Sequence, residues 1–109
     1  MENIVFLELV KRGNVPNRYL FYYKTRNDRE IDFLIKKGID MVELVQACYD
    51  VSNKDVEQRE IKALVEASQE LNVSNLTILT WDEKREVKKG GKNIKLIPIW
   101  EWLLNIKTP

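Results

Sequence analysis

The sequence predicts an α/β domain built on a mixed β-sheet with helices on both of its faces. Two observations predict this class. Short segments rich in apolar and aromatic residues alternate with turn residues in the first half of the chain and again near its end. A long amphipathic pattern of helical period separates these two groups of strands. The length of 109 residues is that of one domain, so residues 1–109 are expected to form a single unit.

The composition is that of a globular protein, and it excludes several kinds of chemistry. Hydrophobic residues make up 44% of the chain and charged residues 32%, which is typical of a chain with a core. Because there is no histidine and Cys48 is the one cysteine, zinc sites of the Cys/His kind, Ser–His and Cys–His nucleophile pairs and an internal disulfide are excluded. The net charge of +1 indicates no global attraction to polyanions, so any basic surface has to be local.

No apolar run approaches the roughly 20 residues that a helix needs to cross a bilayer. The N-terminal segment carries acidic Glu2 and Glu8 where a secretory signal would be basic. We therefore expect a cytoplasmic protein with no membrane partner.

The first half of the chain predicts a helix and three strands. Apolar residues at helical spacing predict a helix over 2–12, which ends at Gly13. The aromatic run 20–23 predicts a strand, and the polar turn that follows joins it to a second strand over 30–36. Residues 41–49 predict a third strand that is apolar on both faces and therefore central in the sheet.

The second half begins with a long helix, which either Ser52 or Asn53 can cap and which carries one apolar stripe. A fourth strand is expected over 76–81, a hairpin tip over 88–92 and a further strand over 94–99. A short helix over 100–104 closes the chain. The order is α-β-β-β-α-β-β-α. Because the long helix forms a right-handed crossover, the third and fourth strands are expected to be parallel.

Several short segments, none of them specific by itself, together form a recognisable set when they are taken in this order of elements. They are residues 2–9 with 12–13, 22–25, 30–35, 44–50, 59–61, 79–83 and 97–100. The ordered set resembles the PD-(D/E)XK nuclease fold. More narrowly, it resembles the nuclease-like C-terminal domain of an archaeal and bacterial family of AAA-type ATPases. The resemblance implies a restriction-endonuclease-like fold and an ATPase domain, in the same or another chain, as partner. The chain would be either a fragment of such an ATPase or a free-standing relative.

The resemblance also implies a site for Mg²⁺ or Mn²⁺. In such a site, two or three carboxylates hold the cation, which polarises a phosphate and activates water, and a nearby lysine stabilises the developing charge. Glu8 matches the acid of the first helix, and Asp32 matches the acid of the second strand. Glu8 can instead pair with Arg12 on the helix surface. Asp32 can instead form a salt bridge with Lys24 or Arg26 across the hairpin.

The third strand departs from the family's Glu-x-Lys pattern. An alignment on Tyr49 places Gln46 at the position of the glutamate and Cys48 at the position of the lysine. An alignment on the nearest carboxylate uses Glu43 and leaves a valine at the lysine position. Alternation places Gln46 on one face of the strand with Val42, Leu44 and Cys48, where the buried amide needs partners such as Asp32 or Glu8.

Two site predictions follow from these alignments. The catalytic set is Glu8, Asp32 and Gln46, and the metal set is Glu8, Asp32 and Glu43. In either case the lysine is missing, and Lys36 or Lys62 would have to replace it. The residues leave open whether the chain is an enzyme.

Six basic residues follow the fourth strand, from Lys84 to Lys95. Lys88, Lys89 and Lys92, at the hairpin tip, are the candidates for contact with nucleic acid. The run can also be a solvated strand edge, where lysine prevents aggregation. Three functions remain: a catalytically degenerate nuclease-fold module that binds DNA or regulates an ATPase, a metal-dependent DNA nuclease, and a pure protein-interaction domain.

Overall fold

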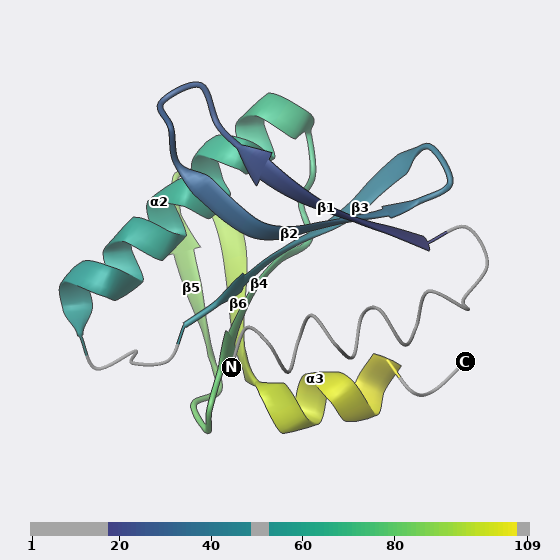
Figure 1. The fold of residues 1–109 in the computed structure, drawn as a ribbon. Helices are drawn as coiled ribbons and strands as arrows, with labels where there is room; N and C mark the ends of the chain where they lie inside the picture. The colour runs from purple at the N-terminus through teal and green to yellow at the C-terminus, as the bar shows by residue number, and fades with distance from the viewer. Residues whose placement is uncertain (1–17, 49–52, 107–109) are drawn as a thin grey trace.

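The computed structural model describes residues 18–48 and 53–106, which form a six-stranded mixed sheet with a helix on each of its faces (Figure 1). The strands lie in the order β1-β2-β3-β4-β6-β5. The elements are β1 (Arg18–Lys24), β2 (Glu30–Lys37), β3 (Asp40–Ala47), α2 (Lys54–Leu71), β4 (Leu76–Thr80), β5 (Arg85–Lys89), β6 (Lys92–Pro98) and α3 (Ile99–Ile106). The helix predicted over residues 2–12 lies outside the described residues.

The pairing of the strands confirms the expected mixed sheet. Strands β1, β2 and β3 form an antiparallel meander, and β5 runs antiparallel to β6. The β3–β4 and β4–β6 pairs are parallel. The parallel β3–β4 pair follows from α2, which carries the chain from the end of one strand to the start of the other. Strand β3 lies inside the sheet, as its apolar residues on both faces predict.

Each face of the sheet has its own apolar core. Leu44 and Ile78 belong to the core under α2. Their chain neighbours Val45 and Leu79 belong to the core under α3, together with Trp102. This division follows from the strand geometry, because successive side chains of a strand point to opposite faces. The central strands β3 and β4 therefore supply both cores.

Helix α2 has defined signals at both ends. The side chain of Asn53 accepts hydrogen bonds from the main-chain N–H groups of Asp55 and Val56, at 3.1 and 3.3 Å. The helix ends where Asn72 adopts the left-handed conformation with φ of 57°, and the N–H of Asn72 donates to the carbonyl of Ser68. The predicted cap at Asn53 is confirmed.

Strand β5 was not predicted as a separate element. Its five residues are charged except for Val87, and it forms one edge of the sheet, so it lacks the apolar alternation that marks a strand. The hairpin tip was predicted, because Gly90 and Gly91 supply the two positive φ angles, 58° and 75°, that a two-residue hairpin turn requires.

The closing helix α3 is longer than the predicted 100–104 and packs as expected. Trp102 lies 4% exposed in the core under α3, whereas Trp100 stays 56% exposed. Among the described helices, none is both long enough and apolar enough to cross a membrane.

Candidate functional site

A β-bulge in β2 sets the position of Asp32. Strand β2 takes three steps from Ile31 to Leu34, whereas the opposite stretch of β1 takes two. Tyr22 of β1 therefore faces both Asp32 and Phe33. The extra residue explains why Ile31 and Leu34 both lie in the core under α2 despite their odd spacing. Bulges redirect side chains, and this one lies where Asp32 meets β3.

Beyond the bulge, side chains replace main-chain hydrogen bonds between β2 and β3. The regular ladder stops one residue before Asp32 and Gln46. The N–H of Asp32 donates to Oε1 of Gln46 at 2.7 Å, and Nε2 of Gln46 donates to the carbonyl of Glu30 at 2.9 Å. In return, the N–H of Ala47 donates to Oδ2 of Asp32 at 2.8 Å. We call this arrangement the Asp32–Gln46 cluster.

The cluster gives Gln46 a structural task. Its side chain is 1% exposed, and both ends of the amide bond the main chain of β2. The expectation that this buried amide contacts Asp32 is confirmed, although the contact is with the main chain of Asp32. The amide carries no charge, and its two hydrogen bonds fix its orientation. At the position that the resemblance assigns to a glutamate, Gln46 therefore supplies no charge.

The other third-strand residues do not restore the pattern. Cys48 is 2% exposed within the core under α2, as expected of a small apolar residue. Glu43 pairs with Ile35, three residues from Asp32, which corresponds to about 10 Å along a strand. Oε2 of Glu43 accepts a hydrogen bond from Oγ1 of Thr77 at 2.8 Å. Glu43 thus lies apart from the Asp32–Gln46 cluster.

The described residues do not form a divalent-cation site by themselves. Within the part of the chain that the structure describes, no three acidic or cysteine side chains are grouped so as to hold a metal. Mg²⁺ and Mn²⁺ favour several oxygen ligands with carboxylates among them. Glu8, which belongs to both predicted sets, lies outside the described residues. Of the groups that could bind a cation, the Asp32–Gln46 cluster holds one carboxylate, that of Asp32, and one neutral amide, that of Gln46.

The two candidate replacements for the missing lysine lie elsewhere. Nζ of Lys36 lies 5.4 Å from the centre of the Phe21 ring, in cation–π geometry. Lys62 lines a groove between α2 and β5, at the edge of the sheet far from β2. Lys24, which was one of two residues expected to form a salt bridge with Asp32, instead has its Nζ 3.8 Å from Oδ1 of Asp28. The structure thus places neither Lys36 nor Lys62 beside Asp32.

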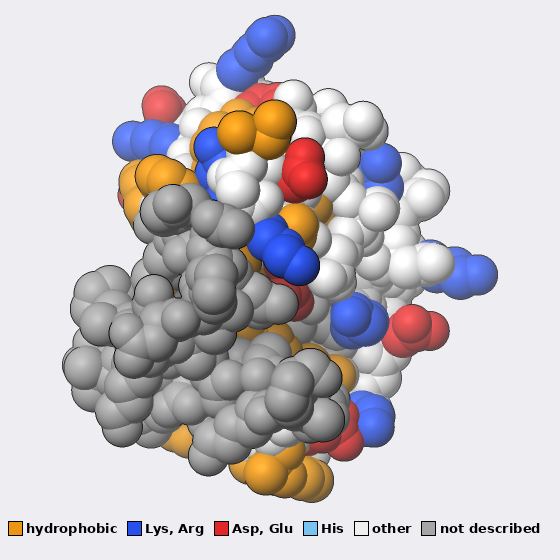
Figure 2. All heavy atoms as spheres, turned by 90° about the vertical axis from the view of Figure 1, so that its right-hand side faces the viewer, with side chains coloured by type: hydrophobic (Ala, Val, Ile, Leu, Met, Phe, Trp, Pro, Cys, Tyr) orange, Lys and Arg blue, Asp and Glu red, His pale blue; other side chains and the backbone are white. Residues whose placement is uncertain are grey.

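The end of the sheet at the β2–β3 turn exposes apolar side chains among basic ones. Ile39 in this turn is 90% exposed, and Phe21 and Met41 are also exposed. Figure 2, which views the molecule from the right-hand side of Figure 1, shows hydrophobic side chains in separate groups with lysine or arginine between them. Among the described residues in this view, the charges interrupt the apolar surface.

Tyr22 is a further polar residue beside the Asp32–Gln46 cluster. The pKa of Tyr22 is raised above its ordinary value, first by loss of water around the phenol and then by a hydrogen bond to Glu30 and the charge of Glu30, with a smaller effect from Asp32. Its side chain remains 59% exposed, so the shift has little energetic weight. Sequence reasoning did not connect Tyr22 with Asp32, because the bulge that brings them together carries no sequence signal.

The basic residues of the second hairpin divide between the two faces of the sheet. Lys89 and Lys92 are directly opposite each other across the β5–β6 pair. Both lie on the α2 side, since Lys89 lines the α2–β5 groove with Val87. Alternation places Lys88 on the other side, where Lys95 also lies because its neighbour Ile94 belongs to the core under α2. The predicted nucleic-acid set therefore does not form one surface.

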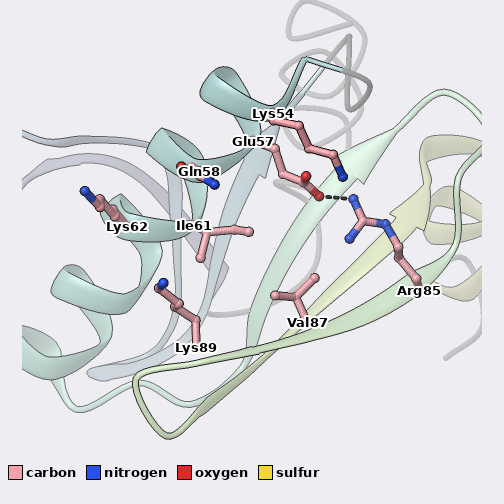
Figure 3. A pocket seen from close by; sticks show the side chains of 8 residues that line it. All are labelled: Lys54, Glu57, Gln58, Ile61, Lys62, Arg85, Val87 and Lys89. Atoms are coloured by element: carbon pink, nitrogen blue, oxygen red, sulfur yellow. Dashed lines mark hydrogen bonds and ion pairs between the residues drawn. The ribbon is translucent and has the colours of Figure 1, made fainter.

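A groove lies between the first half of α2 and strand β5. Its volume is about 420 Å³, and it is lined by Lys54, Glu57, Gln58, Ile61, Lys62, Arg85, Val87 and Lys89 (Figure 3). Four of these side chains are cationic and one is anionic. The structure adds Lys54, Glu57 and Arg85 to the candidate residues. Arg85 was missed because alternation could not be assigned along the unpredicted strand β5. Lys54 and Glu57 lie on α2 and were missed because the strand that faces them was not predicted.

An ion pair at the groove joins α2 to β5. The Glu57 carboxylate is buried and contacts the Arg85 guanidinium. Nε of Arg85 also lies 2.6 Å from Oε1 of Glu83. The two carboxylates hold the guanidinium in place at the wall of the groove.

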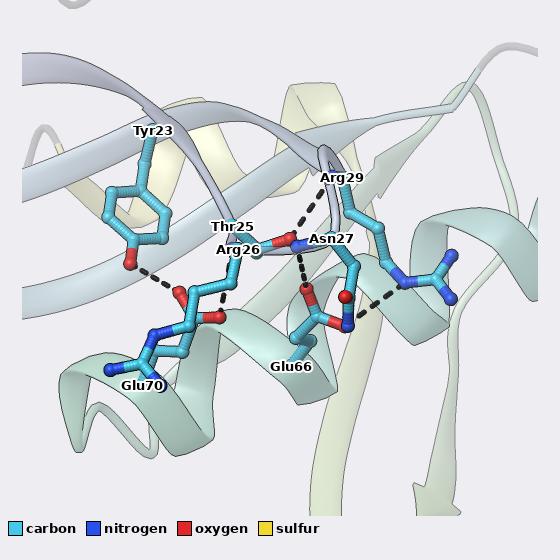
Figure 4. Close-up of polar contacts among 7 residues, drawn as sticks. All are labelled: Tyr23, Thr25, Arg26, Asn27, Arg29, Glu66 and Glu70. Carbon is cyan, nitrogen blue, oxygen red and sulfur yellow. Dashed lines mark hydrogen bonds and ion pairs between the residues drawn. The ribbon is translucent and has the colours of Figure 1, made fainter.

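A second polar cluster joins the β1–β2 turn to the other half of α2 (Figure 4). The side chain of Glu66 accepts hydrogen bonds from Nδ2 of Asn27 at 2.9 Å and from Nε of Arg29 at 3.2 Å. Glu70 accepts from the hydroxyl of Tyr23 at 2.6 Å and from the main-chain N–H of Arg26 at 3.0 Å. These contacts fix the turn on the helix, so we interpret the cluster as structural.

The fold and this arrangement of residues define a mixed α/β domain with the Asp32–Gln46 cluster between β2 and β3 and a groove lined mostly by cations between α2 and β5. The chain belongs to the family described as a domain of unknown function (DUF4143), whose model matches residues 1–102. It is 42% identical over 110 residues to an uncharacterized protein of Methanocaldococcus jannaschii. That match covers 95% of this chain and 24% of the relative, so the chain spans about a quarter of the relative's length. No solved structure matches the chain.

Proposed function

We propose that this chain is a nuclease-fold module that no longer hydrolyses phosphodiesters and that binds nucleic acid through the face carrying α2 and the β5–β6 hairpin. The nuclease fold rests on the resemblance described above, and the mixed sheet is compatible with it. An ATPase domain, in the same or another chain, is the proposed partner on the same basis.

The observation that carries the proposal is the pairing of Lys89 with Lys92 on the α2 side of the hairpin. Like charges directly opposite each other in an antiparallel pair are destabilising. Within the described residues, neither lysine forms an ion pair. A phosphate group between the two would offset their repulsion, and the cations of the α2–β5 groove extend the positive surface beside them.

The Asp32–Gln46 cluster supports loss of hydrolysis. Hydrolysis by this kind of site requires a second acidic ligand on the third strand and a cation near the scissile phosphate. The structure places an amide at the junction and keeps Glu43 with Thr77 on β4. Lys36 and Lys62 lie elsewhere, so neither of the two candidate lysines supplies the cation.

The test measures DNA affinity by fluorescence anisotropy at low salt. The double variant Lys89→Gln/Lys92→Gln should bind about tenfold more weakly, because two phosphate contacts are lost. The matched control Lys88→Gln/Lys95→Gln removes the same charge from the opposite face and should bind as the unchanged protein does. Equal weakening by both double variants, or no DNA binding at all, would contradict the proposal.

A parallel incubation of the protein with supercoiled and single-stranded DNA, in Mg²⁺ or Mn²⁺, tests the loss of hydrolysis. We expect no cleavage. Cleavage that disappears in Asp32→Ala would overturn this part of the proposal and favour the nuclease that uses Glu8, Asp32 and Glu43.

A further inference from the structure

The α2–β5 groove has cations at both ends and apolar side chains between them. Figure 3 shows Lys54 beside Arg85 at one end, and Lys62 and Lys89 toward the other. Ile61 and Val87 lie between the two groups. Among the described residues, none forms an ion pair with Lys54, Lys62 or Lys89. Within the described part of the chain, no carboxylate therefore competes with a ligand for these three ammonium groups.

The arginine of this groove is held in place before any ligand binds. Arg85 is fixed by Glu57 on α2 and by Glu83, yet a guanidinium has five N–H donors and these contacts leave some of them available. The buried carboxylate of Glu57 also prevents the groove from being uniformly positive. Arg85 thus provides a fixed donor, and the lysines provide mobile ones.

The volume and the lining define the class of ligand. A volume of about 420 Å³ lies in the range of small-ligand sites, which combine an apolar surface with a few charged groups. A nucleotide within a nucleic-acid strand also combines an apolar surface with charged groups, because the face of its base is apolar and a phosphate lies on either side of its sugar. Gln58 adds an amide that can hydrogen-bond the edge of a base.

From these features we infer that the groove takes one unpaired nucleotide of a single strand. The base lies on Ile61 and Val87, and the flanking phosphates lie at the two cationic ends. A duplex cannot place a base there without unpairing it, so the groove selects single-stranded over double-stranded nucleic acid. This inference rests on the proposed function, because it assigns the kind of nucleic acid that the same face binds.

The test compares a fluorescent oligothymidylate of about 12 nucleotides with a duplex of the same length, a size that one small domain can span. We expect the unchanged protein to bind the single strand several-fold more tightly. Lys54→Gln/Lys62→Gln, which removes one cation from each end, should abolish this preference by weakening single-strand binding most. Lys88→Gln/Lys95→Gln is the matched control and should retain the preference.

The methyl resonances of Ile61 and Val87 give a readout that does not depend on overall charge. They should shift when oligothymidylate is added and stay in place when the duplex is added. Salt-dependent binding of both nucleic acids with equal affinity, or a preference that survives in Lys54→Gln/Lys62→Gln, would overturn the inference and leave the proposed function intact. Absence of binding to either nucleic acid would refute both.

Discussion

At the scale of single residues, the amide of Gln46 acts as a substitute for a peptide group. It accepts from the N–H of Asp32 and donates to the carbonyl of Glu30, which are the two bonds that a neighbouring strand would supply. A glutamate at this position could accept the first bond but has no N–H to donate the second. The side chain of Gln46 therefore closes the gap between β2 and β3.

Replacing Gln46 with leucine, which has a similar volume, should destabilise the protein substantially. The variant leaves the N–H of Asp32 and the carbonyl of Glu30 without these partners, at a cost of about 1–3 kcal/mol for each buried group. We expect the free energy of unfolding in urea to fall by about 2–5 kcal/mol. Gln69→Leu, on the exposed surface of α2, is the control and should change it by less than about 0.5 kcal/mol. Equal stability of the two variants would contradict the structural role of Gln46.

The contact of Asp32 with Gln46 could be predicted from the sequence, whereas the surrounding side-chain directions could not. Adjacent strands and a buried amide that needs partners are enough to predict the contact. Alternation placed Val42 on the face of Gln46, but Val42 packs against the core under α3. The cause is a second register shift, where β3 takes two steps from Met41 to Glu43 and β2 takes one. Bulges of this kind leave no periodic trace in a sequence.

At the scale of elements, α2 is fixed to the sheet at both halves by charged groups. Glu57 contacts Arg85 of β5, and Glu66 contacts the β1–β2 turn. The apolar stripe of the helix was predictable from its period. The partners of these glutamates were not, because they lie 28 and 39 residues away along the chain.

The contacts of Glu66 should make the stability of this region depend on pH. The pKa of Glu66 is lowered from 4.5 to about 2. The main causes are the hydrogen bonds that its carboxylate accepts from Thr25 and then from Asn27. Because the pKa is depressed in the folded state, the stabilisation is fully present above pH 4.5 and is lost as the pH falls toward 2.

The stability difference between the unchanged protein and Glu66→Gln should therefore be largest near neutral pH and should shrink in acid. Urea unfolding at about pH 6 and about pH 3 measures it. A difference of equal size at both pH values would show that the charge of Glu66 has no role in fixing the turn.

At the scale of the whole molecule, a net charge of +1 conceals an uneven distribution. Lys88, Lys89 and Lys92 were predicted to contact nucleic acid together, but the alternation of β5 and β6 sends Lys88 and Lys95 to one face and Lys89 and Lys92 to the other. The sequence predicted a mixed sheet, the parallel β3–β4 pair and the hairpin tip. It could not predict the groove, because the groove lies between α2 and β5, and β5 has no apolar pattern from which it could be recognised.

The salt dependence of duplex DNA binding tests the central claim most directly. If Lys89 and Lys92 each contact a phosphate, the slope of log affinity against log salt should become shallower by about 1.8 in Lys89→Gln/Lys92→Gln, about 0.9 for each lost contact. The slope should be unchanged in Lys88→Gln/Lys95→Gln. Identical slopes for the unchanged protein and both double variants would contradict the claim that the α2 side of the hairpin binds nucleic acid.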